Sequence, residues 1–352
     1  MSEMKKIISA VLSIVLITGM LIGCGHSTES ETELKNIKIG ISVYNQYDTF
    51  ISELMKSVEE YAQVMEERYD ITVTLDIQNA GNNQMIQNDQ MSYFIDRGCN
   101  VVCINLVDRT DASTIIERGK KANIPIIFFN RELVEEDLER WEKLYYVGAD
   151  AFESGIIQGE ILCEALEKDF DSIDRNQDHV IQYVMLEGEA GHQDSIVRTM
   201  YAVNTVTDAG YEVEKLADEI ANWNRDQAKT KMLSWLQEFG DEIEVIFANN
   251  DDMGLGAKDA LLETGYYEKS DSRPPVILGI DGTTEGLQAV EDEMFLGTVL
   301  NDSDGQARGM LELAYAVVSG KEIPSDFTLL NGKYIRLPYR KIVKDNEKLL
   351  NE

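Results

Sequence analysis

The segment GEAGHQDSIVR, residues 188–198, places three polar side chains with useful chemistry within seven positions. His192, Asp194 and Arg198 follow VIQYVMLE, a run of residues typical of a buried strand. Such a set suits three kinds of chemistry: acid–base catalysis, metal ligation, or hydrogen bonding to a neutral molecule. The neighbouring residues decide among these alternatives.

Catalysis is the first alternative, because Ser195 would complete the composition of a hydrolytic triad. Residues two and three positions apart at the start of a helix point in different directions, so His192, Asp194 and Ser195 do not form a linear relay. Glycoside hydrolysis needs two carboxyl groups that face one bond, and the sequence leaves that arrangement open. Metal ligation is disfavoured, because Arg198 is adjacent and no other histidine is near in the chain. Arg198 and the two aromatic residues described below favour holding a ligand over cleaving it, so we predict a binding protein and not an enzyme.

Polar side chains also stand where other predicted strands end. In open α/β sheets ligands bind outside the carboxyl ends of the strands, so these residues are candidates for one shared site. A single Asn or Asp after a strand is usually a turn former or a helix N-cap, but a series of six strand ends favours a site. The strand-end residues are Asp48, Asn105, His192 with Asp194, Asn250, Asp281 and Asn301.

The chemistry that these side chains share fits a sugar. Carboxylates, amides and a guanidinium group engage adjacent hydroxyl groups in bidentate fashion. The three carboxylates of Asp48, Asp194 and Asp281 against the one cation of Arg198 leave the site near −2, with His192 neutral. This balance disfavours phosphosugars and uronates, and it leaves an amine or a polyamine open as an alternative ligand.

Two aromatic residues complete the predicted site. Phe50 lies two residues beyond Asp48, and Trp223 stands in the polar segment NWNRD. A pyranose presents apolar C–H faces that stack on aromatic rings, so one ring from each half of the protein would hold a flat sugar. Phe50 also fits a core position, whereas a tryptophan in a polar segment is less easily explained as core.

The elements that must position these residues alternate between strands and helices from residue 37 onward. The first group of predicted strands is IKIGISVY, ITVTLDI, NVVCIN and IPIIFF, with amphipathic helical segments between them. The second group is YYVG, VIQYVMLE, YEVEKLA, IEVIFAN and VILGID, again with helices interposed. This order predicts an α/β fold with two doubly wound, parallel-sheet lobes.

Composition limits the partners. The chain has 352 residues, and its 64 acidic against 32 basic side chains give a formal net charge of −32. A polyanion of this size is repelled by phosphate backbones, so we predict no nucleic-acid partner. Cys99 and Cys103 flank an extended run too long for a disulfide, and with Cys163 they are predicted to be thiols.

Residues 1–24 are predicted to form a lipoprotein signal peptide. Lys5 and Lys6 precede the mostly apolar residues 7–22, which are too few for a comfortable membrane span and suit a secretory signal. LIGC, residues 21–24, resembles a bacterial lipobox, which implies cleavage before Cys24 and attachment of lipid to its sulfur. The polar residues 25–36 are then a flexible tether. We predict an extracytoplasmic protein that is lipid-anchored to the bacterial cell membrane.

Longer strings carry a family resemblance. NQYDTF, INLVD, FFNRE, YYVGAD, ESGIIQGE, GEAGHQD, ANNDDMG, GTVLND and RLPY resemble, in order, the bacterial galactose/glucose-binding proteins of ABC transport, which have the type I periplasmic binding protein fold. The resemblance implies hydrogen bonds to a hexose from the polar residues and stacking from the two aromatic ones. The residues concerned are Asp48, Phe50, Asn105, His192, Asp194, Arg198, Trp223, Asn250, Asp281 and Asn301.

The same resemblance implies a three-segment hinge near Asn123, Asn301 and Arg336. The N-terminal lobe is then expected to contain residues 37–123 and 302–335, and the C-terminal lobe residues 124–301 and 336–352. Ligand binding in such a protein closes the lobes around the sugar. A sugar-responsive repressor shares this fold but needs a basic helix-turn-helix at its start, where this chain has the lipobox.

A calcium loop is also implied. DRNQDHVIQ resembles an EF-hand loop, with the matching bidentate carboxylate supplied from later in the chain. The departure from the pattern is His179, which stands where a glycine normally makes the sharp turn. The expected ligands are Asp174, Asn176, Asp178, the Val180 carbonyl, Gln182 and Glu244.

The predicted function is capture of D-glucose or D-galactose for delivery to an ABC transporter permease. The chain is expected to act as a monomer with a structural Ca²⁺ ion. A role as a sugar sensor for a chemoreceptor or a sensor kinase stays open, as does a pentose or polyamine ligand. Glucose and galactose differ only at the C4 hydroxyl, and the sequence does not decide between them.

Overall fold

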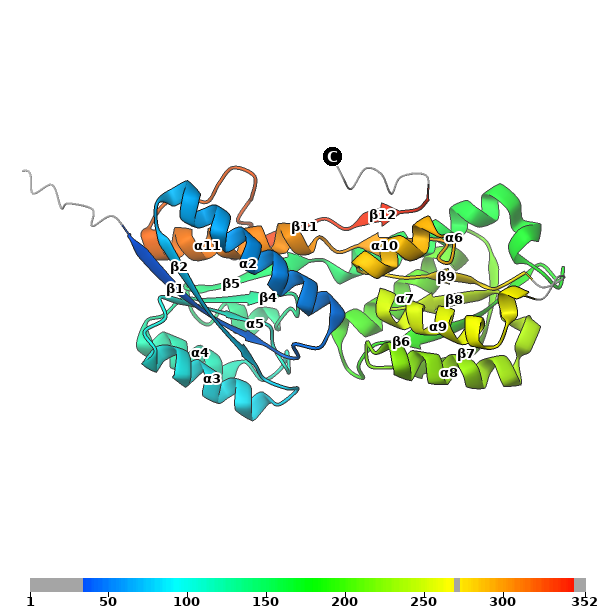
Figure 1. The fold of residues 1–352 in the computed structure, drawn as a ribbon, viewed down its shortest axis with the longest axis horizontal. Helices are drawn as coiled ribbons and strands as arrows, with labels where there is room; N and C mark the ends of the chain where they lie inside the picture. Colours follow the sequence, from blue (N-terminus) through cyan, green and yellow to red (C-terminus); the bar gives the residue numbers. More distant parts are fainter. Residues whose placement is uncertain (1–33, 269–272, 345–352) are drawn as a thin grey trace, which may run out of the picture. The chain divides into compact units, whose positions relative to one another are not determined.

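Two parallel β-sheets organise the part of the chain that the computed structural model describes, residues 34–268 and 273–344 (Figure 1). The first sheet has the strand order β11-β5-β4-β3-β1-β2 and is parallel throughout. The second has the order β7-β6-β8-β9 and is also parallel. The predicted α/β class, with two doubly wound sheets, is confirmed.

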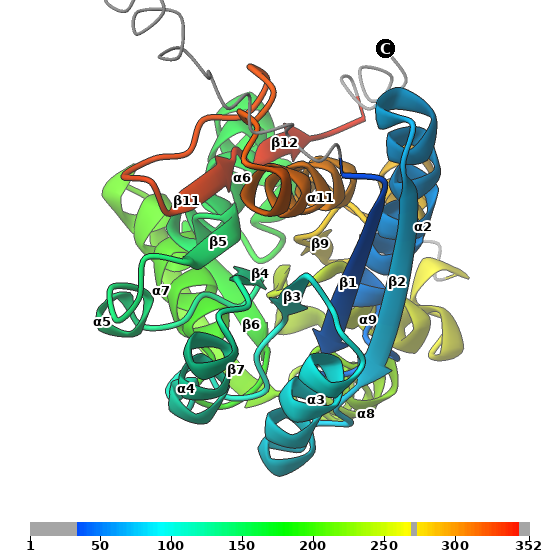
Figure 2. The same ribbon diagram turned by 90° about the vertical axis from the view of Figure 1, so that its left-hand side faces the viewer.

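Helices cover both faces of the first sheet, with α2 and α11 on one side and α3 and α4 on the other (Figure 2). Since both faces are covered, the central strands β3 and β4 are buried at every residue, which explains their continuous apolar sequences. The strands are β1 (Asn36–Val43), β2 (Thr72–Asn79), β3 (Val101–Ile104), β4 (Ile126–Phe129), β5 (Leu144–Ala149) and β11 (Tyr334–Leu337). The helices are α2 (Thr49–Tyr69), α3 (Gln84–Asp96), α4 (Ser113–Ala122), the short α5 (Glu135–Leu138) and α11 (Ser303–Ser319).

The second sheet is covered in the same way, by the helix pairs α6 with α7 and α8 with α9. Its strands are β6 (Val180–Glu187), β7 (Glu212–Ile220), β8 (Val245–Ala248) and β9 (Val276–Leu278). Two short strands, β10 (Thr298–Leu300) and β12 (Arg340–Ile342), pair antiparallel beside it. The helices are α6 (Ala151–Ile173), α7 (Gln193–Asp208), α8 (Arg225–Glu238), α9 (Asp251–Glu263) and α10 (Thr284–Glu291), with 3₁₀ turns at Gly240–Glu242 and Tyr266–Glu268.

The chain passes between the two sheets three times. It leaves the first sheet after β5, returns between β10 and α11, and leaves again between β11 and β12. We therefore define the first lobe as residues 35–149 and 302–337, and the second lobe as residues 150–301 and 338–344. The return agrees with the predicted crossing at Asn301, because β10 belongs to the second lobe and α11 packs against α2 of the first.

The predicted crossing near Asn123 is wrong. Asn123 is the left-handed C-cap of α4, with φ 57°, and it makes an ordinary helix-to-strand turn. The next two strands, β4 and β5, pair in register with β3 and with each other, so residues 124–149 belong to the first lobe. The crossing predicted at Arg336 is shifted, because Arg336 pairs with Gly148 inside β11 and the chain leaves the sheet after Leu337.

The predicted signal peptide and its Cys24 lie outside the described residues. Within the described ranges, no helix is long and apolar enough to cross a membrane. Cys99, Cys103 and Cys163 are free thiols, as predicted. Burial raises the pKa of Cys103 and of Cys99, which suits small apolar residues of the core more than reactive groups.

Candidate ligand-binding site

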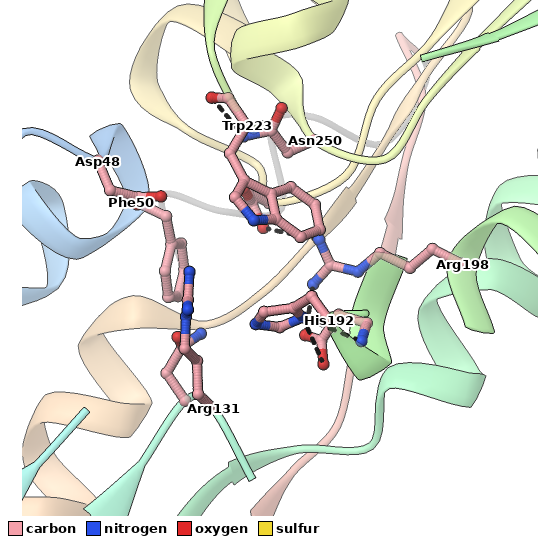
Figure 3. Close-up of a pocket in the computed structure, with 10 residues that line it drawn as sticks. Asp48, Phe50, Arg131, His192, Arg198, Trp223 and Asn250 are labelled. Carbon is pink, nitrogen blue, oxygen red and sulfur yellow. Dashed lines mark hydrogen bonds and ion pairs between the residues drawn. The ribbon is translucent and has the colours of Figure 1, made fainter. Parts of the chain in front are cut away.

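Loops at the carboxyl ends of strands from both lobes enclose one cavity, which we call the central cavity (Figure 3). Its volume is about 330 Å³, including its mouth. Phe50 and Arg131 stand on one side of it, and Trp223, His192 and Arg198 on the other. The lining residues are Asp48, Phe50, Asn130, Arg131, His192, Asp194, Arg198, Trp223, Asn250 and Asp281.

Two hydrogen bonds within the first lobe orient the Asp48 carboxylate. It is the N-cap of α2, and its Oδ1 accepts the Ile51 N–H at 2.9 Å. Its Oδ2 accepts the hydroxyl of Tyr44 at 2.5 Å. Burial and the Asp48 carboxylate raise the pKa of Tyr44, so the phenol stays protonated and keeps donating. The carboxylate therefore meets a ligand in one fixed orientation, with its remaining lone pairs as acceptors.

Arg131 links the two lobes at the cavity. Its guanidinium lies 3.4 Å from the centre of the Tyr44 ring and donates to the Val107 carbonyl at 3.2 Å. Its other terminal nitrogen is 3.0 Å from the Glu189 carboxylate of the second lobe. The guanidinium is 6% exposed, so this ion pair is partly shielded from water. Tyr44 and Arg131 thus connect the Asp48 carboxylate to the opposite lobe.

His192 is a neutral hydrogen-bond donor. It is the N-cap of α7, and its Nδ1 accepts the Asp194 N–H at 3.1 Å. The pKa of His192 is lowered to about 3, because burial lowers it, Asp194 opposes this only in part, and the nearby arginines add to the lowering. Because Nδ1 accepts, the single ring proton is on Nε2. The ring meets Trp223 edge to face, with centroids 5.3 Å apart.

Arg198 is the central cation of the second lobe, and its side chain is 4% exposed. Nη1 donates to the Asn249 carbonyl at 2.8 Å, and Nη2 donates to the Tyr339 hydroxyl at 3.2 Å. The carboxylates of Asp194 and Asp281 lie 3.4 and 3.6 Å from its terminal nitrogens. Burial alone would lower the pKa of Arg198, but these neighbours raise it, so the guanidinium stays charged.

Asp281 sits in an unusual backbone conformation, with φ 122° followed by Gly282 at 65°. Asp251 stabilises this turn, because its Oδ2 accepts the Thr283 N–H at 2.8 Å and its Oδ1 accepts the Thr298 hydroxyl at 2.5 Å. Burial raises the pKa of Asp281 well above its usual range and that of Asp251 to about 7. A strained carboxylate held by a buried network is typical of a functional site.

Trp223 occupies a space that a glycine leaves free. Asn222 and Trp223 are both left-handed, with φ 53° and 61°, and Asn250 donates to the Trp223 carbonyl at 3.4 Å. A Cβ on Gly188 would lie 2.1 Å from the indole ring. The ring position therefore depends on the absence of a side chain at residue 188.

Two of the predicted ligand residues, Asn105 and Asn301, are not among the residues that line the cavity. Asn105 is fully buried behind it, where its amide donates to Asn130 Oδ1 at 3.0 Å and to the Phe129 carbonyl. Its own Oδ1 accepts the Tyr44 N–H. Asn105 therefore orients Asn130, whose Nδ2 is left to face a ligand. Asn301 is also buried, and its Oδ1 accepts Gln306 Nε2 at 2.6 Å.

The sequence reasoning missed Asn130 and Arg131. Asn130 directly follows β4, so the strand-end rule that selected the other polar residues also applied to it. Arg131 had no such signal, because its role depends on Tyr44 and on Glu189 of the other lobe. The remaining eight predicted ligand residues line the central cavity together.

The predicted calcium loop, between α6 and β6, is held by hydrogen bonds among its own residues. Asp174 accepts the N–H groups of Gln177 and His179, and Asn176 donates to Asp178 and to Gln182. His179 has φ 67°, the left-handed turn that a glycine normally makes.

Glu244, the predicted ligand from later in the chain, reaches this loop. Its two carboxylate oxygens accept the N–H groups of Arg175 and Gln182 at 2.5 and 3.1 Å. Among the described residues no cluster of three or more His, Cys, Asp or Glu side chains is close enough to hold a metal ion. The predicted set relies instead on amide and carbonyl oxygens beside its carboxylates, which is a donor set that Ca²⁺ accepts.

Comparison with known proteins places these features in a family. A family model described as a periplasmic binding protein domain matches residues 39–322. The D-galactose/methyl-galactoside binding periplasmic protein MglB of Haemophilus influenzae is 34% identical over 345 residues, covering 97% of this chain and 98% of that protein. A putative rhizopine-binding protein of Rhizobium meliloti is 29% identical over 97% of both chains.

Solved structures share the fold. An ABC transporter solute binding protein from Bacillus halodurans with bound myo-inositol has a TM-score of 0.73 at 24% identity, covering 91% of this chain and 98% of that one. A periplasmic solute binding protein from Actinobacillus succinogenes with bound D-allose has a TM-score of 0.73 at 21% identity, covering 89% and 99%.

The Gly188→Ala substitution is expected to displace the Trp223 ring. Overpacking of this kind costs about 1–3 kcal/mol of stability, and it should expose the indole. Acrylamide quenching of tryptophan fluorescence is then expected to increase, since Trp141 and Trp235 are only 6% and 3% exposed and contribute little. Gly309→Ala is the control, because its Cβ would lie 3.3 Å from Phe327 and far from any tryptophan of the cavity. Equal quenching in both variants would contradict the role of Gly188.

Proposed function

The chain belongs to the periplasmic binding protein family, and we propose that it captures a neutral hexose, D-galactose or D-glucose, and delivers it to an ABC transporter. As an extracytoplasmic solute-binding protein it is not an enzyme. The observation that supports the hexose most is the central cavity itself. It combines two aromatic rings with carboxylates, amides, a neutral histidine and two guanidinium groups that are each ion-paired with a carboxylate.

Several relatives and similar structures are named for, or hold, neutral molecules with several hydroxyl groups. The relative from Haemophilus influenzae is named for D-galactose and methyl-galactoside, and two of the similar structures hold myo-inositol and D-allose. A relative from Mycolicibacterium smegmatis that is 29% identical is named a xylitol-binding protein. These ligands share the pattern of adjacent hydroxyls, and the higher identity to the galactoside binder favours a hexose.

Each side of the cavity contributes a different part of the recognition. The first lobe offers the Asp48 carboxylate and the Asn130 amide, while the second offers the His192 Nε2 donor and the Asp194 and Asp281 carboxylates. Phe50 and Trp223 approach from opposite lobes, as two faces of a pyranose require. Because neither lobe holds the full set, binding favours the arrangement in which both lobes face one ligand.

The Arg131–Glu189 ion pair supports this arrangement. It joins the loops after β4 and β6 at a distance of 3.0 Å, immediately beside the central cavity. A pair that forms only when the lobes approach stabilises the bound state and slows release of the sugar. The free sugar is passed to the transporter without chemical change.

Titration calorimetry of the full-length chain in detergent micelles tests the hexose proposal. We expect micromolar or tighter binding of galactose or glucose, and weaker binding of ribose, xylose and putrescine. Asp281→Ala and Trp223→Ala should each weaken hexose binding at least about tenfold, which corresponds to 1.4 kcal/mol or more. Thr207→Ala, on the exposed end of α7, is the control. Absence of hexose heat from a folded protein would refute the proposal.

We also propose that the 174–182 loop with Glu244 binds a structural Ca²⁺ ion. The strained φ of 67° at His179 opposes the turn by about 1 kcal/mol, so His179→Gly should tighten Ca²⁺ binding about fivefold. Calorimetry with CaCl₂ and the melting temperature with and without EDTA measure the effect. Asn82→Gly relieves a similar φ of 60° outside the loop and should leave Ca²⁺ affinity unchanged. An EDTA-insensitive melting temperature with no calcium heat would contradict the site.

The proposed lipid anchor at Cys24 has a separate test. In cells that process lipoproteins, the wild-type chain should sediment with membranes, and mass spectrometry should find diacylglyceryl on Cys24. Cys24→Ser should release the chain from the membrane fraction, whereas Cys163→Ser should not. Membrane association of the Cys24→Ser variant would show that another segment anchors the protein.

A further inference from the structure

A second cavity adjoins the central one, and nothing in the hexose proposal uses it. We call it the outer cavity, and it encloses about 830 Å³, including its open side. Its walls are the loop after β3 in the first lobe and the loop after β6 in the second lobe. The lining residues are Val107, Asp108, Arg109, Thr110, Arg131, Glu189, Ala190, Gly191 and His192.

The two cavities share Arg131 and His192 as a common boundary. Both side chains are fixed by protein contacts. Arg131 is held by Tyr44, Val107 and Glu189, and the His192 ring is held by the Asp194 N–H and by Trp223. The boundary between the two cavities is therefore a guanidinium and an imidazole in fixed positions.

The lining of the outer cavity is polar and balanced in charge. Asp108 and Glu189 oppose Arg109 and Arg131, two negative groups against two positive ones. This balance favours a neutral group over an anion or a cation. Its described lining residues include no Phe, Tyr or Trp, so a sugar ring there would be held mainly by hydrogen bonds.

Arg109 carries the available donors. Its Nε donates to the Glu132 carbonyl at 2.8 Å, which fixes the plane of the guanidinium. For its two terminal nitrogens the described part of the chain supplies no hydrogen-bond acceptor. Thr110 donates through its N–H and its hydroxyl to Asp108 Oδ1, at 2.8 and 2.7 Å, which orders that carboxylate as an acceptor. An oriented donor pair beside an ordered acceptor suits hydroxyl groups.

We propose that the ligands of this protein include neutral hexosides, with the hexose in the central cavity and a second hydroxylated group, such as another sugar ring, in the outer cavity. This inference rests on the proposed hexose function and extends it from free hexoses to disaccharides. The second ring exchanges water for hydrogen bonds with Arg109, Asp108 and Glu189, so it adds selectivity more than affinity.

Calorimetry with galactose, glucose, methyl β-D-galactoside, lactose, melibiose and maltose on the full-length chain in micelles tests the proposal. For at least one of the disaccharides, the dissociation constant should be no more than about a hundredfold higher than that of the tighter-binding hexose. Thr110→Trp and Ala190→Trp fill the outer cavity from opposite lobes at exposed positions that do not line the central cavity. Each should weaken that disaccharide at least about tenfold and leave hexose affinity within about twofold.

Thr207→Trp adds an indole at an exposed position on α7 and is the control, with no expected change for any ligand. Melting temperatures identify a variant that fails to fold. Thr110→Trp and Ala190→Trp place their indole rings on different lobes, so one variant still tests the proposal if the other does not fold. Hexose binding without any disaccharide binding overturns the inference and leaves the proposed function intact. Binding of neither kind of sugar refutes both. Disaccharide affinity that is unchanged in both filling variants, or hexose affinity that falls equally, also overturns the inference.

Discussion

The central cavity depends on one buried cation. Arg198 is 4% exposed and is joined to the end of β8 through the Asn249 carbonyl, to the third crossing through Tyr339, and to the carboxylates of Asp194 and Asp281. Leaving such a charge without its partners costs about 3–5 kcal/mol, so these groups must stay in place around it. The same guanidinium lies beside both carboxylates, and at Asp281 it opposes the rise in pKa that burial causes. Recognition of a neutral, hydroxyl-rich ligand follows from this fixed arrangement.

The remaining geometry of the cavity is maintained against local strain. Trp223 and Asp281 adopt positive φ angles that cost about 1–3 kcal/mol each in a non-glycine residue. Neighbouring groups offset this cost: Asn250 bonds to the Trp223 carbonyl, and Asp251 anchors the turn that follows Asp281. Contacts within the second lobe therefore hold the Trp223 ring and the turn at Asp281, which reduces the entropy lost on binding.

Much of the fold and most of the site could be predicted from the sequence, because alternating strands and helices and polar strand ends are local patterns. Asn105 and Asn130 show the limit of that reasoning, because only Asn130 lines the central cavity. Both are asparagines directly after buried, adjacent parallel strands, and no local feature tells which amide faces the cavity. The crossing near Asn123 failed for a related reason, since only strand pairing assigns β4 and β5 to the first sheet.

The sequence by itself determined the α/β class, the order of the elements and the polar and aromatic residue types at the strand ends. It did so because side-chain periodicity and turn chemistry act over a few residues. Only the tertiary structure decided that Asn105 supports Asn130, that Arg131 bridges Tyr44 and Glu189, and that a second cavity adjoins the first. These features join residues up to 145 positions apart, as Tyr44 and Glu189 are, and such contacts exist only once the sheets and their loops have come together.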